Sequence, residues 1–77
     1  MTESAHWHLT YPEELVSEPV LWELAHRFGL RTNIRRANVE DDIGWVIVEV
    51  HGDPDQLAAG RAWLVGRGVA VADLPAG

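Results

Sequence analysis

Residues 45–51, Trp45-Val-Ile-Val-Glu-Val-His51, decide the expected fold of this 77-residue chain. Every second residue is a valine, so one face of an extended strand would consist of Val46, Val48 and Val50. β-branched residues at this spacing are typical of strands that pack against a core. Turn-forming residues precede the stretch at Asp41–Gly44, and Gly52 follows it. The sequence therefore predicts a central strand over residues 45–51.

A helix is expected directly after this strand. Asp53 is suited to cap its N-terminus, and a proline follows in the first turn. Gly66 and Gly68 are expected to end this helix, and a last short strand should occupy residues 69–74. The inner face of the helix is predicted from the spacing of its small and apolar residues, which are Leu57, Gly60, Leu64 and Val65.

Another helix is expected earlier in the chain. Ser17 or Glu18 could cap it, Pro19 suits its first turn, and Gly29 should stop it. Its apolar face is predicted to carry Val20, Leu21, Leu24, Ala25 and Phe28. The opposite side would carry Trp22, His26 and a Glu23–Arg27 pair at the favourable four-residue spacing.

Two further strands complete the pattern. Residues 6–11 alternate between apolar and polar side chains, and residues 30–40 have an extended character. The alternation is blurred at Arg35-Arg36-Ala37, which favours a β-bulge there. The resulting order is strand, helix, strand, strand, helix, strand. It predicts an α+β, ferredoxin-like βαββαβ sandwich, with a four-stranded antiparallel sheet, both helices on one face and the other face open.

The length allows one small domain. We expect residues 6–74 to form it, with residues 1–5 and 75–77 as flexible ends. A chain this short buries only about 60% of its unfolded surface, so it gains stability from a partner subunit. No stretch is long and apolar enough to span a membrane or to act as a signal peptide, which predicts a cytoplasmic protein without membrane insertion.

The composition excludes several kinds of chemistry. The chain has no cysteine, and all six of its basic residues are arginine, so thiol nucleophiles, cysteine-bound metals and Schiff-base lysines are absent. Asp41-Asp42 resembles a solvated turn more than a catalytic carboxylate pair, and no catalytic triad or phosphate loop can be assembled. The net charge of −6 would repel nucleic acid. We therefore expect a protein that is not an enzyme, needs no cofactor and does not bind nucleic acid.

Three segments together resemble the NIL domain family. They are residues 18–34, which end in Asn33-Ile34, then Val48-Glu-Val-His-Gly52, and Ala62-Trp-Leu64 before Gly68-Val69. NIL domains form the C-terminal regulatory module of methionine ABC-importer ATPases, and they also occur alone or fused to ferredoxins in proteins linked to sulfur metabolism. The resemblance implies the same ferredoxin-like fold and pairing through the sheets. In the importer members, methionine binds where two such domains meet.

The family name comes from an Asn-Ile-Leu run, which stands here as Asn33-Ile34-Arg35. The resemblance implies that Asn33 helps to hold an amino-acid ligand, and Ile34, Arg35 and Arg36 complete the predicted ligand-binding set. Two other interpretations stay open. Asn33 could simply hydrogen-bond a neighbouring loop or strand end. Arg35 and Arg36 could be solvated edge charges or ion-pair partners of Glu49 or Asp41.

Two candidate interfaces follow from the pattern. Trp22 and His26 fall on the solvent side of their helix. There Trp22 is either a contact for another protein or a side chain that folds over its own helix or touches residues 13–17. The open sheet face is expected to carry His8, Thr10, Trp45 and Ile47. Burial of this face against a second copy predicts a homodimer, unless the N-terminal tail covers the face instead.

The leading functional hypothesis is a non-catalytic regulatory or sensor module. It would bind a small amino acid, methionine or a related sulfur metabolite, at a homodimer interface. The alternative is a ligand-free interaction adaptor for a sulfur-metabolism enzyme, a ferredoxin or a transporter. A third class, a metal chaperone, would use His6 and His8 with His51, although histidines on a terminal strand are usually solvated and no metal ligand is assigned.

Overall fold

The computed structural model describes residues 2–15, 18–39 and 44–75. Ser17, one of the two predicted cap residues, lies outside the described residues, as do residues 41–43 of the predicted turn. The secondary structure consists of strands β1 (Glu3–Tyr11), β2 (Arg31–Val39), β3 (Gly44–Gly52) and β4 (Ala70–Leu74), helices α1 (Val20–Phe28) and α2 (Pro54–Arg67), and a short 3-10 helix (Glu13–Leu15).

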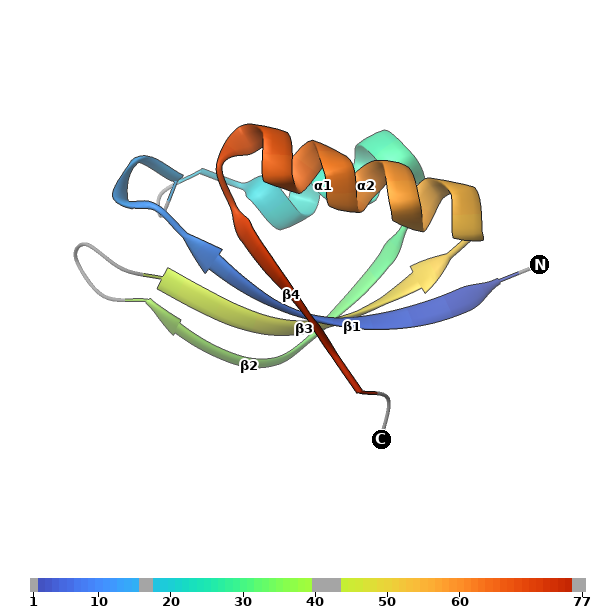
Figure 1. Ribbon diagram of the computed structural model, residues 1–77, viewed down its shortest axis with the longest axis horizontal. Helices are drawn as coiled ribbons and strands as arrows, with labels where there is room; N and C mark the ends of the chain where they lie inside the picture. The colour runs from blue at the N-terminus through green and yellow to red at the C-terminus, as the bar shows by residue number, and fades with distance from the viewer. Residues whose placement is uncertain (1, 16–17, 40–43, 76–77) are drawn as a thin grey trace.

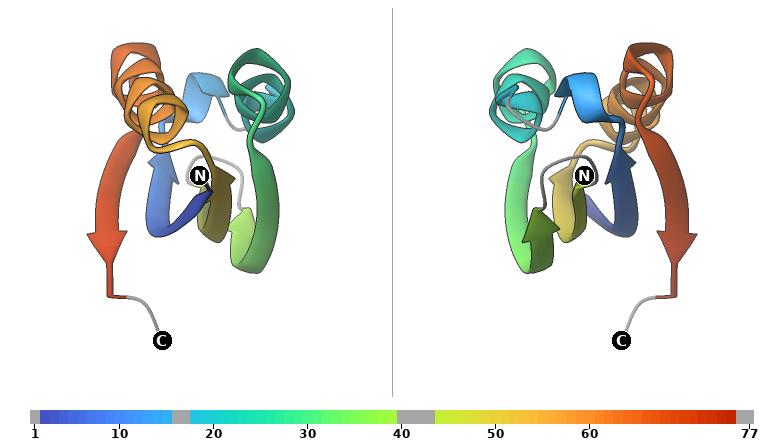
Figure 2. Two further views of the ribbon diagram at one scale, coloured as in Figure 1. Left: turned by 90° about the vertical axis from the view of Figure 1, so that its right-hand side faces the viewer. Right: turned by 90° about the vertical axis from the view of Figure 1, so that its left-hand side faces the viewer.

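The four strands form one antiparallel sheet in the order β2-β3-β1-β4. Both α-helices lie on the same side of this sheet, and within the described residues the other side carries no helix (Figures 1 and 2). This arrangement confirms the predicted α+β, ferredoxin-like sandwich. The two central strands, β1 and β3, are those with the clearest alternation in the sequence, because a central strand is held on both sides and buries one complete face.

The core lies between the sheet and the helices. Val46, Val48 and Val50 of β3 are buried, as predicted, and they meet Trp7 and Leu9 of β1. The helices contribute further buried side chains to the same cluster, which are Val20, Leu24, Leu57 and Leu64. The remaining side chains of β1 and β3 must therefore point to the uncovered face, because successive residues of a strand alternate between faces.

The predicted β-bulge is confirmed in β2. Opposite pairs run from Arg31↔His51 to Ile34↔Val48, and the register then shifts so that Arg36 lies opposite Ile47. Arg35 is thus the extra residue. A bulge resets the alternation of the strand. Arg36 therefore shares the uncovered face with Ile47, whereas regular alternation would have placed it over the core.

The ends of the helices differ in part from the predictions. The N-cap of α1 is Pro19, and the side chain of Glu18 makes no capping hydrogen bond. Asp53 caps α2 as predicted, with its carboxylate accepting from the Asp55 amide at 3.3 Å. Gly29 and Gly68 close the two helices in the left-handed conformation, at φ 62° and φ 97°, which costs a glycine little. The prediction that Gly66 ends α2 was wrong, since Gly66 lies inside the helix.

Two side-chain predictions for the helices were also wrong. Val65 is 52% exposed rather than part of the inner face of α2, because Leu57, Gly60 and Leu64 already fill the contact with the sheet and α1. Glu23 accepts a hydrogen bond from Arg67 of α2 at 2.9 Å rather than pairing with Arg27 along its own helix. This ion pair joins the two helices.

Strand β1 begins at Glu3, three residues before the predicted start, because Glu3 to Ala5 continue the pairing with β3. Strand β4 begins at Ala70 rather than at residue 69. The domain boundaries at residues 6 and 74 stay predictions. Among the described residues, no helix is long and apolar enough to cross a membrane.

Candidate functional site on the uncovered sheet face

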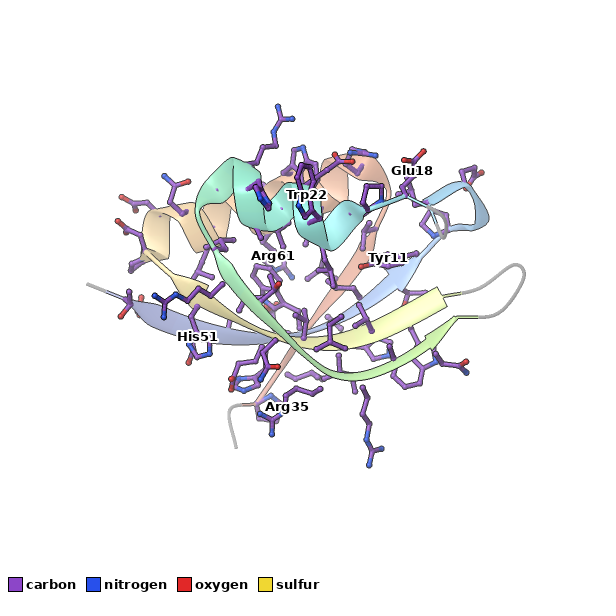
Figure 3. The ribbon with its side chains drawn as sticks, turned by 180° about the vertical axis from the view of Figure 1, so that it is seen from behind. Tyr11, Glu18, Trp22, Arg35, His51 and Arg61 are labelled. Carbon is purple, nitrogen blue, oxygen red and sulfur yellow. The ribbon has the colours of Figure 1, made fainter. Side chains whose placement is uncertain are left out.

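The uncovered sheet face carries most of the residues singled out in the sequence. His8 and Thr10 of β1 lie opposite Ile47 and Trp45 of β3, so these four half-buried side chains share this face, as expected. His8 and Trp45 stack with ring centroids 5.4 Å apart and an interplanar angle of 18°. Figure 3 shows the face from the side, with the labelled Arg35 on it and Trp22 on the helical layer beyond the sheet.

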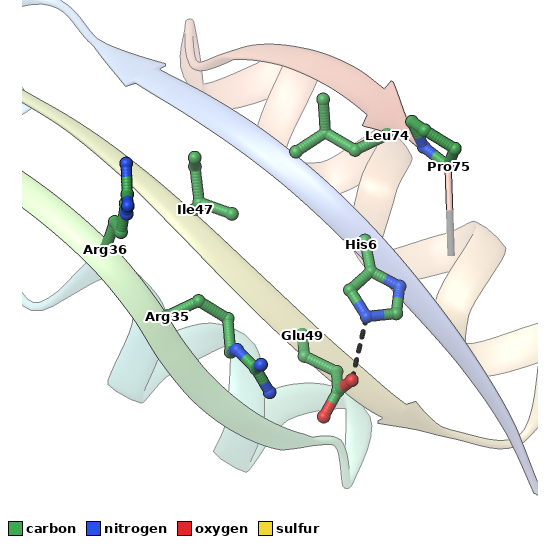
Figure 4. Close-up of a pocket in the computed structure, with 7 residues that line it drawn as sticks. All are labelled: His6, Arg35, Arg36, Ile47, Glu49, Leu74 and Pro75. Carbon is green, nitrogen blue, oxygen red and sulfur yellow. Dashed lines mark hydrogen bonds and ion pairs between the residues drawn. The ribbon is translucent and has the colours of Figure 1, made fainter. Parts of the chain in front are cut away.

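A pocket of about 590 Å³ opens on this face. Its walls come from all four strands and from the residue that follows β4 (Figure 4). Polar and apolar side chains both contribute, and the lining consists of His6, Arg35, Arg36, Ile47, Glu49, Leu74 and Pro75. Leu74 reaches the pocket because it lies opposite His6 in the β1–β4 pairing. The sheet register thus assembles the pocket from residues that are distant in the sequence.

Glu49 is the one carboxylate in the lining of this pocket. His6 Nε2 donates to Glu49 Oε2 at 2.8 Å, and His51 Nε2 donates to Glu49 Oε1 at 2.9 Å. The hydrogen bond from His51, followed by that from His6, lowers the pKa of the Glu49 carboxyl below its ordinary value of 4.5. An ionised carboxylate only accepts hydrogen bonds, so both imidazoles carry a proton on Nε2.

Two arginines supply the positive charge of the pocket. Arg35 is the bulge residue and Arg36 follows it, so both side chains reach the same pocket although they are neighbours in the chain. Arg35 extends toward Glu49 (Figure 4), but within the described part of the chain neither arginine side chain forms a hydrogen bond or an ion pair. The ion pair with Glu49 considered from the sequence is therefore not formed, because the two histidines occupy that carboxylate.

The other two predicted ligand residues lie elsewhere. Asn33 is opposite Glu49, so it shares the uncovered face, but its exposed side chain is not part of the pocket wall. Ile34 is opposite the buried Val48 and thus lies on the helical side of the sheet, where it is 55% exposed at the edge. The structure brings Arg35 and Arg36 together and separates Asn33 and Ile34 from them.

Trp22 and His26 form a separate patch on the outer surface of α1. Trp22 is 60% exposed, and the centroids of the Trp22 and His26 rings are 4.1 Å apart. His26 Nδ1 donates to the Trp22 carbonyl oxygen at 2.9 Å, one turn away on the helix. A shallow hollow of about 300 Å³ lies beside these rings, lined also by Glu23 and Arg27. Because α1 covers the other face of the sheet, this patch and the pocket lie on opposite sides of the domain.

Sequence reasoning did not assign His6, Glu49, Leu74 or Pro75 to a ligand pocket. Glu49 and His51 are two apart in a strand and therefore share a face, which is the one local signal that was available. The contribution of His6 and Leu74 depends on strand register. Among the described residues, no group of three or more His, Cys, Asp or Glu side chains is placed to hold a metal ion.

The architecture defines the class of this protein, an α+β sandwich with one uncovered sheet face that carries a mixed polar and apolar pocket. Residues 5–72 match the family model of the NIL domain. The chain belongs to the NIL domain family.

A solved structure shares this fold. It is the C-terminal domain of an ABC transporter ATP-binding protein from Enterococcus faecalis, which aligns with a TM-score of 0.80 over 95% of this chain and 86% of that chain. The sequences are 13% identical, so the likeness concerns the fold. No curated protein matches the sequence significantly.

Proposed function

We propose that this NIL domain is a non-catalytic regulatory or sensor module that binds a small amino acid, methionine or a related sulfur metabolite, on its uncovered sheet face. Membership of a family that supplies regulatory domains to ABC-transporter ATPases supports the regulatory part of the proposal. The observation that carries the ligand part is the pocket itself, in which two arginines without ion-pair partners, among the described residues, face an apolar wall.

The residues of the pocket suit the two ends of such a ligand. The guanidinium groups of Arg35 and Arg36 offer charge-assisted hydrogen bonds to a carboxylate. Ile47, Leu74 and Pro75 offer apolar contact to an aliphatic or thioether side chain. Asn33 lies on the same face, where its amide could contact a ligand that extends beyond the pocket.

A second copy of the chain is the proposed cover for this face. Trp45 and Ile47 are half-buried on this face, and His8 stacks on Trp45. Burial of these side chains against a twin would remove apolar area from water, and a twofold axis would place two pockets at one seam. A ligand at that seam would favour one arrangement of the dimer over another, which is sufficient for a signal.

Calorimetric titration of the protein with L-methionine, with sedimentation equilibrium on the same samples, tests the proposal. We expect saturable binding and a dimer at high micromolar concentration. Arg36→Gln should weaken binding, whereas Arg27→Gln, which removes the same charge from α1, should not. Absence of heat with methionine, cysteine, homocysteine and S-adenosylmethionine, together with a monomer mass, would refute it.

The exposed Trp22 favours a second candidate function, an interaction adaptor for a sulfur-metabolism enzyme, a ferredoxin or a transporter. A tryptophan that is 60% exposed beside a shallow hollow is a common anchor of protein interfaces. In this case no small molecule would change the melting temperature, and Trp22→Ala would abolish co-purification with the partner. Retained co-purification and an unchanged oligomeric state in Trp22→Ala would exclude this role for the patch.

A further inference from the structure

The charge of the uncovered face differs in sign from that of the chain. The whole chain carries a net charge of −6 with histidines neutral. The described residues of the uncovered face include Arg31, Arg35 and Arg36 against the single carboxylate of Glu49. Two of these arginines, Arg35 and Arg36, line the pocket, so the positive potential there attracts anions and repels cations.

Glu49 is poorly available to a ligand. Each of its two carboxylate oxygens already accepts a hydrogen bond from a different histidine, at 2.8 Å and 2.9 Å. A ligand ammonium group would have to compete with these two donors, and it would also approach the guanidinium group of Arg35, which extends toward the same carboxylate (Figure 4). The amino group of an amino acid therefore gains little in this pocket.

The arginines are in the opposite situation. Within the described residues, Arg35 and Arg36 have no ion-pair partner, and both line the pocket. An incoming carboxylate or other oxyanion would not have to displace a carboxylate of the described residues from either of them. Guanidinium groups bind planar oxyanions through paired N–H donors. The pocket can therefore bind one negatively charged group next to an apolar wall.

We infer that the pocket selects a ligand with a net negative charge, a small carboxylate or related oxyanion on an apolar chain, in preference to a zwitterion of the same shape. This inference rests on the proposed function in so far as it uses the same pocket, and it names the chemical class of the ligand. Arg35 and Arg36 determine the specificity. Glu49, whose two oxygens already accept from His6 and His51, does not serve as the ammonium site.

Three compounds that share the same thioether chain separate the contributions of the ligand's carboxylate and its amino group. They are L-methionine, 4-(methylthio)butanoate, which lacks the amino group, and 3-(methylthio)propylamine, which lacks the carboxylate. In calorimetric titrations at low ionic strength, we expect the butanoate to bind more tightly than L-methionine by about ten-fold and the amine not to bind. Added salt should weaken the binding of the butanoate.

Variants of the pocket locate the effect. Arg35→Gln and Arg36→Gln should each weaken butanoate binding by about ten-fold, the loss of a charge-assisted hydrogen bond, whereas Arg27→Gln on α1 should not. Glu49→Gln should bind the butanoate with at least the wild-type affinity, and it should not weaken the binding of L-methionine. Urea midpoints of all variants verify that the fold is retained, and both arginine side chains are exposed, so neither substitution should disturb it.

The outcomes distinguish this inference from the proposed function. If L-methionine binds as well as the butanoate, or loses affinity in Glu49→Gln, the anion preference is wrong although an amino-acid sensor remains. If the butanoate binds and no amino acid does, the anion site stands and the amino-acid sensor is refuted. If none of the three compounds binds, the anion preference is refuted, whereas the amino-acid sensor is refuted only when cysteine, homocysteine and S-adenosylmethionine also give no heat and the protein is a monomer.

Discussion

Glu49 on β3 lies directly opposite His6 on β1, and the two side chains meet in a 2.8 Å hydrogen bond across the strand pair. This contact joins the two central strands on the uncovered face. His51, two residues along β3, donates to the other oxygen of the same carboxylate. The resulting His–Glu–His row holds the only carboxylate of the pocket lining in place and leaves the neighbouring arginines unengaged within the described residues.

Replacement of Glu49 by glutamine should reduce the acid sensitivity of the fold. Because the pKa of the Glu49 carboxyl is lowered on folding, its stabilising effect is complete above its ordinary value of 4.5 and is lost as the pH falls through the lowered value. The wild type should therefore lose stability more steeply than Glu49→Gln between about pH 5 and pH 3. Urea midpoints measured across this range verify the difference. Parallel curves for the two proteins would contradict it.

Truncation of Leu64 should be costly, whereas truncation of its neighbour should not. Leu64 is fully buried between α2 and the sheet, so Leu64→Ala should lower the free energy of unfolding by about 2–5 kcal/mol. Val65 is 52% exposed, and Val65→Ala should change it by less than about 0.5 kcal/mol. Chemical denaturation measures both values. Equal losses would show that α2 is rotated relative to the structure described here.

Replacement by alanine should change the stability of the protein in opposite directions at two glycines. Gly29 has φ 62°, a conformation that costs an L-residue about 1–2 kcal/mol, so Gly29→Ala should destabilise the protein by about that amount. Gly66 lies inside α2 with nothing within 4 Å of an added Cβ, so Gly66→Ala should stabilise the protein by up to about 1 kcal/mol. Thermal unfolding of the two variants tests this pair, and a loss of stability in both would refute the helical placement of Gly66.

The sole tyrosine offers a titration without overlapping tyrosine signals. Burial raises the pKa of Tyr11 from 10.0 to about 12, because the charged phenolate is disfavoured away from water. The folded protein thus keeps its proton when the unfolded chain has lost it, so stability should fall as the pH rises from 10.0 toward 12. Near-ultraviolet absorbance of tyrosinate should change together with alkaline unfolding. A transition near pH 10 in a protein that is still folded would contradict this prediction.

The fold was predictable from the sequence, whereas much of the pocket was not. The valines at alternate positions of β3 and the glycine stop of α1 are local signals, and they gave the right elements. The bulge at Arg35 was also predicted, because its two arginines interrupt the alternation. The predicted Glu23–Arg27 pair is replaced by an ion pair between Glu23 and Arg67 of the other helix, which spacing along one helix could not indicate.

By itself, the sequence determined the order of the elements and the buried face of each central strand, because periodicity is a property of neighbouring residues. Only the tertiary structure decided which side chains meet on the uncovered face. The register of β1 and β3 joined His6 to Glu49, and the pairing of β4 brought Leu74 beside them. The register shift in β2 turned Arg36 to the same side as Ile47. These contacts join residues that are distant in the chain. They depend on which strands pair and in which register, and local sequence patterns do not specify either.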